Sequence, residues 1–348
     1  MDQQDGKREL EQQQAAAPKP GQEKRSGQTP DGNLLAVVVP CYNEEESLPH
    51  FAEVWAGVER EVAGFFPRVE YVLVNDGSAD GTLGVMRAMS AADPRWHYTS
   101  FSRNFGKEAG LIAGLERALA LGATHVVVMD ADLQDPPQLM PELCREMAEG
   151  GCDVVATYRR TRAGEPPVRS WFAHRFYGLM NRHSDVQMRD GARDFRLMTR
   201  RAVEAICSLP ERERFSKGIF VWVGFDTRWV GYDNVEREWG STSWSFWGLV
   251  RYALDGVVAF STAPLEAVSV AGLATFLLSI IFLIFIIVRA LIFGDPVAGW
   301  PSLVCLITLF SGMLMLGMGI VGLYVAKIYS ESKGRPHYIV AEQDGERH

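Results

Sequence analysis

The chain has 348 residues, enough for one large hydrophobic core and an additional segment, and its 43 acidic and 35 basic residues give a net charge of −8. This negative balance argues against a nucleic-acid-binding protein. The five cysteines show no C-x-x-C pair and no metal-ligand spacing, so we expect buried thiols in a reducing compartment rather than a disulfide framework.

Residues 1–33 are rich in Gln, Lys, Glu, Pro and Gly and contain almost no apolar side chains. Such a composition buries too little apolar surface to offset the entropy of folding, so we expect a disordered N-terminal tail. The tail lacks the apolar core of a secretory signal, and we expect none here.

Strand-like and helix-like patterns alternate from Leu34 to about Val155. This alternation predicts an α/β domain with a mostly parallel sheet covered by helices on both faces, and we place its end near residue 240. The predicted strands are 35–39, 71–74, 96–100, 125–129 and 154–157, and the predicted helices are 47–62, 82–90, 108–121 and 138–149.

Polar motifs follow the first two predicted strands, where open α/β sheets bind ligands. Pro40-Cys41-Tyr42-Asn43-Glu44 follows the first strand and Asn75-Asp76-Gly77-Ser78 follows the second. Asp76 is suited to accept hydrogen bonds from a nucleotide base or ribose, and Gly77 lets the backbone approach a ligand closely. Asn-Asp-Gly-Ser is also good turn chemistry, so the string alone leaves both interpretations open.

Two basic residues, Arg103 and Lys107, precede a predicted helix. They are candidates to neutralise phosphate, and solvated charge at a helix start is the equally weighted alternative. The chain contains neither a P-loop nor the G-x-G-x-x-G dinucleotide fingerprint.

Two aspartates, Asp130 and Asp132, stand one residue apart directly after the predicted strand 125–129. Two unpaired carboxylates pointing into one cleft would repel each other, and one would tend to remain protonated. A divalent cation removes this conflict, because Mg²⁺ or Mn²⁺ takes one or two carboxylates and completes its shell with water and phosphate oxygens. The motif therefore suggests a metal that holds a diphosphate; for a D-x-D pair alone, a solvated turn is the better-weighted alternative.

A further acid, Asp194, enters an apolar strand pattern. A partly desolvated carboxylate there is a candidate general base with a raised pKa. A salt bridge with Arg193 or Arg196 is the alternative that the pattern alone favours. Residues 212–218 and 236–244 contain cations beside glycine and hydroxyl residues, a mixture that suits phosphate recognition and also ordinary surface turns.

Two segments are candidates for a lipid surface. Residues 159–183 mix arginines with aromatic side chains, and helical spacing in the second part gives one basic and one aromatic face. Such a helix suits anionic headgroups, and an ordinary amphipathic helix packed on the sheet is the alternative. Residues 241–264 include an aromatic belt, which predicts a juxtamembrane interface helix.

Two apolar runs, 265–293 and 302–326, are each long enough to cross a hydrocarbon core of about 30 Å as a helix. Their short connector has no Lys or Arg, whereas Arg251 precedes the first run and Lys327 follows the second. Basic residues favour the cytoplasmic side, so we expect a multi-pass membrane protein with both termini, the α/β domain and the tail 327–348 in the cytoplasm.

Taken together and in this order, the motifs resemble the family 2 glycosyltransferases, and within them the polyprenyl-phosphate sugar transferases of the dolichyl-phosphate mannose synthase type. The resemblance runs from about residue 34 to the C-terminus and is strongest to bacterial members with a two-helix membrane hairpin. The matching strings are Val38–Glu45, Val74–Thr82, Phe101–Gly110, Met129–Pro137, Asp194–Met198 and the Arg237…Gly240…Ser243 segment.

The resemblance implies a GT-A nucleotide-sugar-binding fold and an inverting, metal-dependent transfer of a hexose to polyprenyl (undecaprenyl) phosphate. UDP-glucose or another UDP-hexose is the expected donor, Mg²⁺ or Mn²⁺ the cofactor, and the lipid-linked phosphosugar would serve cell-envelope glycan modification. By matching motifs, the donor would be held by Pro40, Tyr42, Glu44, Asp76, Lys107 and Arg237, the metal and diphosphate by Asp130, Asp132 and Gln134, and the lipid phosphate by Arg159 and Arg175. Asp194 would be the catalytic base or an acceptor-positioning carboxylate, acting beside Asp132.

One departure from the family concerns the diphosphate. Many relatives carry Lys directly after the serine equivalent to Ser243, where this chain has Trp244. The contact expected from that lysine is therefore in question, and Lys217 and Arg214 are the candidates to replace it.

Two other functions compete with lipid-phosphate glycosylation. A processive polysaccharide synthase would need more membrane spans and typically a Gln-x-x-Arg-Trp string, which is absent. A catalytically silent membrane scaffold or sugar-lipid carrier is disfavoured by the retained aspartates and Arg237. The sequence leaves open the sugar, UDP against GDP, the identity of the metal, and whether the chain forms a homo-oligomer.

Overall fold

The computed structural model describes residues 32–160, 189, 191–212, 214–233 and 299–347, together with isolated helical positions between 268 and 292. The predictions for most of the N-terminal tail, for the interface segment beyond residue 160 and for the helix 241–264 lie outside the described residues. The same holds for two predicted site residues, Arg175 and Arg237.

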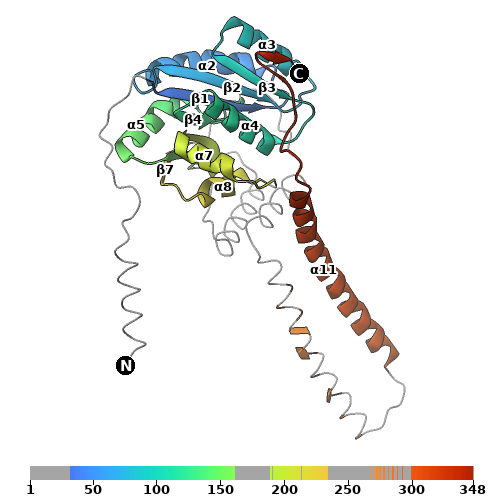
Figure 1. The fold of residues 1–348 in the computed structure, drawn as a ribbon. Helices are drawn as coiled ribbons and strands as arrows, with labels where there is room; N and C mark the ends of the chain where they lie inside the picture. Colours follow the sequence, from blue (N-terminus) through green and yellow to red (C-terminus); the bar gives the residue numbers. More distant parts are fainter. Residues whose placement is uncertain are drawn as a thin grey trace, which may run out of the picture. The chain divides into compact units, whose positions relative to one another are not determined.

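Nine strands of the described residues form one sheet, in the order β7-β5-β6-β4-β1-β2-β3-β8-β9 (Figure 1). Strands β4, β1, β2 and β3 are mutually parallel, as predicted, whereas β6 runs antiparallel between β4 and β5, and β8 runs antiparallel along β3. The strands are β1 (Leu34–Cys41), β2 (Arg68–Asn75), β3 (Trp96–Phe101), β4 (His125–Val128), β5 (Val154–Arg159), β6 (Ala192–Thr199), β7 (Thr227–Tyr232), β8 (Val340–Gln343) and β9 (Glu346–Arg347).

Helices cover both faces of the sheet because side chains of the buried strands alternate between two cores. Leu35, Val37 and Val39 of β1 belong to one core, with apolar residues of α2, α3 and α5. Ala36 and Val38 belong to the other, with α4, α7 and α8. The helices of the domain are α2 (Ser47–Val62), α3 (Thr82–Ala92), α4 (Lys107–Ala120), α5 (Met140–Gly150), α7 (Arg200–Ser208) and α8 (Ser216–Trp222), with the short 3₁₀ helix η1 (Pro137–Leu139) before α5.

A long apolar helix, α11 (Trp300–Ser332), follows in the chain. Its 33 residues span about 50 Å, more than the hydrocarbon thickness of a bilayer. Large apolar side chains such as Leu314 and Met318 are about two-thirds exposed, as expected of a lipid-facing surface. Within the described residues, 310–332 is the one segment long and apolar enough to cross a membrane. The predicted second run 302–326 lies inside α11, and the first run is described only at isolated helical positions.

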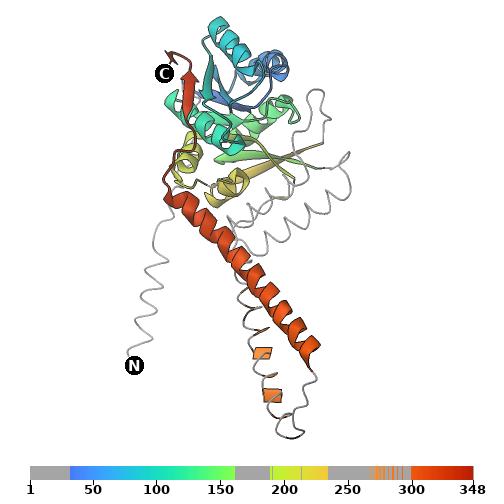
Figure 2. The same cartoon turned by 90° about the vertical axis from the view of Figure 1, so that its right-hand side faces the viewer.

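The C-terminal residues differ from the sequence expectation of a tail over 327–348. Residues 327–332 continue α11, and the chain then returns to the sheet as β8 and β9 (Figure 2). The four residues of β8 are Val-Ala-Glu-Gln, too short and too polar to show a strand pattern. Pairing with the exposed edge of β3 makes them a strand, so tertiary context decides their structure.

Candidate active site

The loops that follow β1 and β2 are joined by a network of hydrogen bonds. The amide of Asn43 donates to Ser78 Oγ (3.0 Å), the amide of Ala79 donates to Asn43 Oδ1 (2.9 Å), and the amide of Glu44 donates to Thr82 Oγ1 (2.8 Å). Asn43 adopts a left-handed backbone (φ 57°), a conformation that asparagine tolerates better than most residues. The network holds the first predicted motif rigidly, with the ring of Tyr42 45% exposed beside it.

Asp76 ties a third loop to these two. The residue is 4% exposed; its Oδ1 accepts a hydrogen bond from the Phe105 amide (2.6 Å) and its Oδ2 one from the Gly106 amide (2.9 Å). Burial raises the pKa of Asp76, and the two amide bonds partly oppose that rise. The sequence predicted a nucleoside ligand here; the structure shows a carboxylate that orders the β3–α4 loop.

Lys107, the first residue of α4, joins two of the predicted acids. Its Nζ lies 2.7 Å from Asp130 Oδ1 and 2.7 Å from Asp194 Oδ2, although the three residues come from separate elements. Burial disfavours the charge on Lys107, but the two carboxylates outweigh that cost and raise its pKa. The lysine side chain is still 37% exposed, so the cluster opens to solvent.

The raised pKa expected for Asp194 is wrong. Burial acts to raise the pKa of this carboxyl, but the adjacent ammonium of Lys107 lowers it well below its usual range. Asp194 does form an ion pair, as the alternative predicted, but its partner is Lys107 and not Arg193 or Arg196. Arg193 binds Asp135 instead, and Arg196 Nε donates to the main-chain oxygen of Asp194 (3.3 Å).

The D-x-D motif forms a turn at the end of β4. Ala131 is buried in the core, whereas Asp130 and Asp132 on either side of it are part-exposed. Asp132 Oδ1 accepts a hydrogen bond from the amide of Gln134 (3.2 Å), and Leu133 takes a left-handed backbone (φ 53°). Such strain in a non-glycine residue is typical of functional turns.

The described residues contain no group of three carboxylate, histidine or cysteine side chains that could hold a cation. Two carboxylates are sufficient for Mg²⁺ or Mn²⁺ when water and a diphosphate complete the shell, and Asp130 and Asp132 supply two. Asp130 would bind such an ion in place of its contacts with Lys107 Nζ, which lies 2.7 Å from Oδ1 and 2.9 Å from Oδ2. Gln134 is engaged as well, because its Oε1 accepts a hydrogen bond from the guanidinium of Arg159 (3.1 Å). That bond brings Arg159, predicted to face the lipid phosphate, next to the metal motif.

The buried carboxylate of Asp135, three residues after Asp132, makes several contacts beside this motif. Asp135 is 2% exposed and binds Arg193 Nε at 2.8 Å and the hydroxyl of Tyr232, with the Arg159 guanidinium 3.9 Å away. Among the described residues, Asp135 Oδ2 and Arg159 Nε are buried with no hydrogen-bond partner. These contacts link the D-x-D turn to β6, the strand that carries Asp194.

A further carboxylate, Glu108, follows Lys107 in α4 and contacts Ser216, the first residue of α8. It accepts hydrogen bonds from the amide of Ser216 (3.0 Å) and from the Ser216 hydroxyl, and burial raises its pKa to about 7. This contact places Lys217 near Asp194. The positive charge of Lys217 helps to lower the pKa of Asp194. Arg214 instead donates to the main-chain oxygens of Leu209 and Ile206 (both 3.0 Å) at the end of α7.

Comparison with known proteins identifies relatives that span most of this chain. The family model for glycosyl transferase family 2 matches residues 36–207. A putative glycosyltransferase, CsbB, of Bacillus subtilis (strain 168) is 40% identical over 309 residues, covering 89% of this chain and 92% of that protein. A bactoprenol glucosyl transferase of Shigella phage SfV is 39% identical over 310 residues, covering 89% of this chain and 98% of that protein.

The chain belongs to glycosyl transferase family 2. The α/β class and the parallel core predicted from the sequence are confirmed, and membership of the family implies the GT-A architecture. Among solved structures, a glucosyl-3-phosphoglycerate synthase from Mycobacterium tuberculosis aligns with a TM-score of 0.43 at 18% identity, over 66% of this chain and 79% of that chain. Nothing about donor or acceptor follows from a likeness at that level.

Sequence reasoning missed several residues that organise the site of this family 2 glycosyltransferase. Asp135 lies inside the Met129–Pro137 motif and its acidity was a visible signal, but its partner Tyr232 is 97 residues away. Glu108 stands beside Lys107, where its position at the start of a helix gives no sign of a further role. The pairing of Glu108 with Ser216 spans 108 residues and has no local signature.

Proposed function

We propose that this family 2 glycosyltransferase transfers glucose from UDP-glucose to the phosphate of a polyprenyl (bactoprenol) carrier. The observation that carries the proposal is the strand-end cluster of Asp130, Lys107 and Asp194 in a chain 39% identical, over nearly the whole length of both proteins, to a bactoprenol glucosyl transferase. The product would be a lipid-linked phosphosugar with inverted anomeric configuration.

The donor would lie across the ends of β1, β2 and β4. The exposed ring of Tyr42, with Pro40 and Glu44 beside it, offers a surface for the nucleoside, and Asp76 holds the β3–α4 loop that would border it. Asp130 and Asp132 would hold Mg²⁺ or Mn²⁺, which neutralises the charge that develops on a departing diphosphate. This chain has Trp244 where many relatives carry the lysine that contacts the diphosphate. Of the two candidates to replace that lysine, Lys217 would supply the contact, because Arg214 is engaged at the end of α7.

Asp194 would position groups rather than abstract a proton. A carboxylate whose pKa lies well below its usual range is a weak base. The acceptor does not require a strong one, because a phosphate monoester with a second pKa of about 6 is already largely ionised at pH 7. Asp194 would orient Lys107, while Arg159 would bind the acceptor phosphate; it donates to Gln134, and its Nε has no hydrogen-bond partner within the part of the chain that the structure describes. Arg175 and Arg237 would complete the acceptor and donor contacts.

The pairing of β8 with β3 supports a two-span membrane hairpin. Because β8 follows α11 in the chain and pairs with β3, the catalytic domain and the C-terminus lie on one side of any membrane that α11 crosses. The chain must then cross that membrane an even number of times between residues 233 and 340. A second span within residues 234–299 satisfies this requirement, and the basic residues that flank the hairpin favour the cytoplasmic side of the inner membrane.

The test is synthesis of the glycolipid by the purified full-length chain in nanodiscs. We expect UDP-glucose, Mg²⁺ or Mn²⁺ and undecaprenyl phosphate to give one glucosylated lipid by mass spectrometry, and Asp132→Asn to reduce the initial rate at least about 100-fold. The matched control, Asp93→Asn, breaks the ion pair with Arg95 before β3 and should leave the rate unchanged.

Two outcomes would refute the proposal. Absence of glycolipid with every UDP- and GDP-sugar would remove the transferase activity. Undiminished product from Asp132→Asn would remove the assigned site. A lipid that carries several sugars would instead indicate a processive synthase, and metal-dependent nucleotide binding without turnover would indicate a carrier.

A further inference from the structure

The segment after α11 lies along the strand that leads into the donor-site loop. Strand β8 pairs with β3 in the register Thr99↔Gln343, Ser100↔Glu342 and Phe101↔Val340. The pairing extends beyond both ends of β8, because the Ser102 amide donates to the Ile339 oxygen (3.0 Å) and the Asp344 amide to the Tyr98 oxygen (3.1 Å). The C-terminal segment therefore runs along β3 from Tyr98 to Phe101 and along Ser102, the first residue of the β3–α4 loop.

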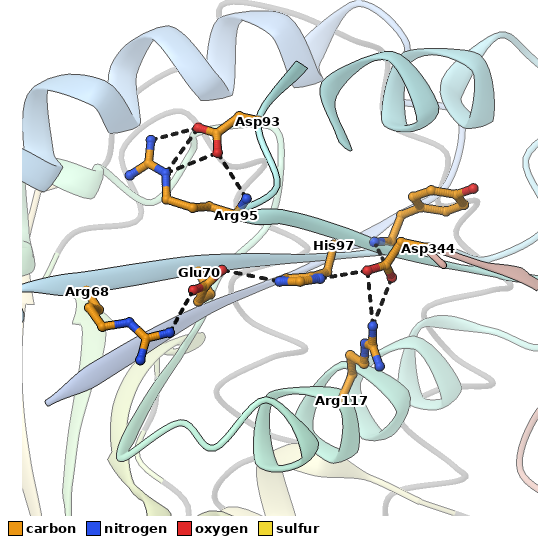
Figure 3. Close-up of polar contacts among 8 residues, drawn as sticks. Arg68, Glu70, Asp93, Arg95, His97, Arg117 and Asp344 are labelled. Atoms are coloured by element: carbon orange, nitrogen blue, oxygen red, sulfur yellow. Dashed lines mark hydrogen bonds and ion pairs between the residues drawn. The ribbon is translucent and has the colours of Figure 1, made fainter. Parts of the chain in front are cut away.

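Charged side chains fasten this segment at its far end. Asp344 Oδ2 lies 2.6 Å from His97 Nδ1, both carboxylate oxygens of Asp344 accept from Arg117 (3.1 Å each), and Glu70 contacts the other ring nitrogen of His97 at 3.2 Å (Figure 3). The side chains of His97 and Asp344 are only about 15% exposed. Partly buried, charge-assisted bonds of this kind are stronger than those of an exposed pair.

Aromatic rings connect the other end of the segment to the donor site. Tyr338 stacks on Phe101 with ring centroids 4.8 Å apart, and its hydroxyl binds Glu116 of α4. Phe101 meets Phe105 edge-on at 5.8 Å, and the amide of Phe105 is one of the two that donate to Asp76. Contacts thus run from the C-terminal segment to the carboxylate that orders the loop before Lys107.

Besides its bonds to Asp76, the β3–α4 loop is bounded by neighbouring segments on two sides. Gly77 packs directly against the backbone of Arg103 and Asn104, so the loop is closely bounded on the side of β2. On its other side, the Ile339 oxygen accepts from the amide of Ser102, and Tyr338 stacks on Phe101, the residue before the loop. The C-terminal segment therefore bounds the start of this loop on the side of β3 away from β2.

We propose that Tyr338 is a positioning residue of the transferase: through Phe101 and Phe105 it holds the β3–α4 loop in the conformation that binds the sugar nucleotide. This inference rests on the proposed function. It makes the C-terminal segment part of the donor site, so the membrane hairpin, which lies between the catalytic core and this segment, also delivers a component of the site. An edge cover with no influence on the donor is the competing account.

The test compares Tyr338→Ala with Tyr338→Phe in the full chain. Phenylalanine keeps the stacking on Phe101 and loses only the hydroxyl bond, whereas alanine loses both. We expect Tyr338→Ala to raise the KM for UDP-glucose and the Kd for UDP about fivefold while the KM for undecaprenyl phosphate is unchanged. Tyr338→Phe should restore both donor constants to within about twofold of wild type. Circular dichroism and thermal unfolding identify any loss of folded protein.

A donor Kd that is unchanged in folded Tyr338→Ala would overturn the inference, and so would an equal rise in both KM values. If Tyr338→Ala does not fold, Phe101→Leu provides the second measurement: the same rise in donor KM is expected, and an unchanged donor KM would overturn the inference equally. Binding of UDP to the wild type separates the two proposals. If the wild type binds no nucleotide with either metal, the proposed function is contradicted. If wild type and Tyr338→Ala bind UDP equally, only this inference is contradicted.

Discussion

Gly77 is the position where the structure predicts the sharpest effect of one methyl group. Its φ of 63° is left-handed, and an added Cβ would lie 2.3 Å from the main-chain carbon of Arg103. The left-handed conformation costs a non-glycine residue about 1–2 kcal/mol, and overpacking against backbone that cannot rotate away adds about 1–3 kcal/mol. Gly77→Ala should therefore lower the free energy of unfolding by about 2–5 kcal/mol, a large part of the stability of an ordinary domain.

Urea unfolding of the full chain in detergent, followed by tryptophan fluorescence, measures this loss. Gly151→Ala is the matched control, because Gly151 has a similar φ of 60° but open space where its Cβ would lie. The control should lose only the conformational part, about 1–2 kcal/mol. Equal losses in the two variants would show that close approach of the β2 and β3 loops is not what requires glycine.

Two further predictions concern charge. Hydrogen bonding to Asp344 raises the pKa of His97 in the folded protein, so its stabilisation is complete below the unfolded histidine pKa of about 6.5 and is lost as pH rises through the folded pKa. The difference in melting temperature between wild type and His97→Gln should shrink from pH 5.5 to pH 9; a constant difference would contradict the ion pair. Lys217→Met should raise the KM for UDP-glucose about tenfold, as for one lost charge-assisted contact, whereas Arg214→Met should lower the melting temperature and leave that KM unchanged. The reverse pattern would assign the diphosphate to Arg214.

The core of the fold followed from local pattern. Apolar, β-branched runs such as Val37–Val39 and Val126–Val128 are typical of buried strands in a parallel sheet, and the periodic segments between them are typical of the helices that cover it. The same pattern placed the polar motifs at strand ends. Because those strands are parallel, it predicted that the loops of Asp76 and Asp130 lie at one edge of the sheet. The polar C-terminal strand escaped it, since Val340–Gln343 is ordered by the edge it pairs with and not by its own side chains.

The individual site residues were more predictable than their pairings. Lys107 was expected to face phosphate and Asp194 to act as a base or to pair with a neighbouring arginine, yet they bind each other across 87 residues of sequence. Sequence spacing limits which neighbours on one helix or strand can meet, but it carries no information about contacts between elements that fold from distant parts of the chain.

The amino-acid sequence by itself determined the α/β core, the strand-end position of the acids and the apolar helix, because each depends on the order of polar and apolar residues within one element. Tertiary structure alone decided the lowered pKa of Asp194, the buried contacts of Asp135 and the return of the C-terminus to β3. The physical reason is that a pKa, a buried ion pair and a strand edge are set by whatever lies within a few ångströms, and folding brings those groups together from segments whose local patterns are independent of one another.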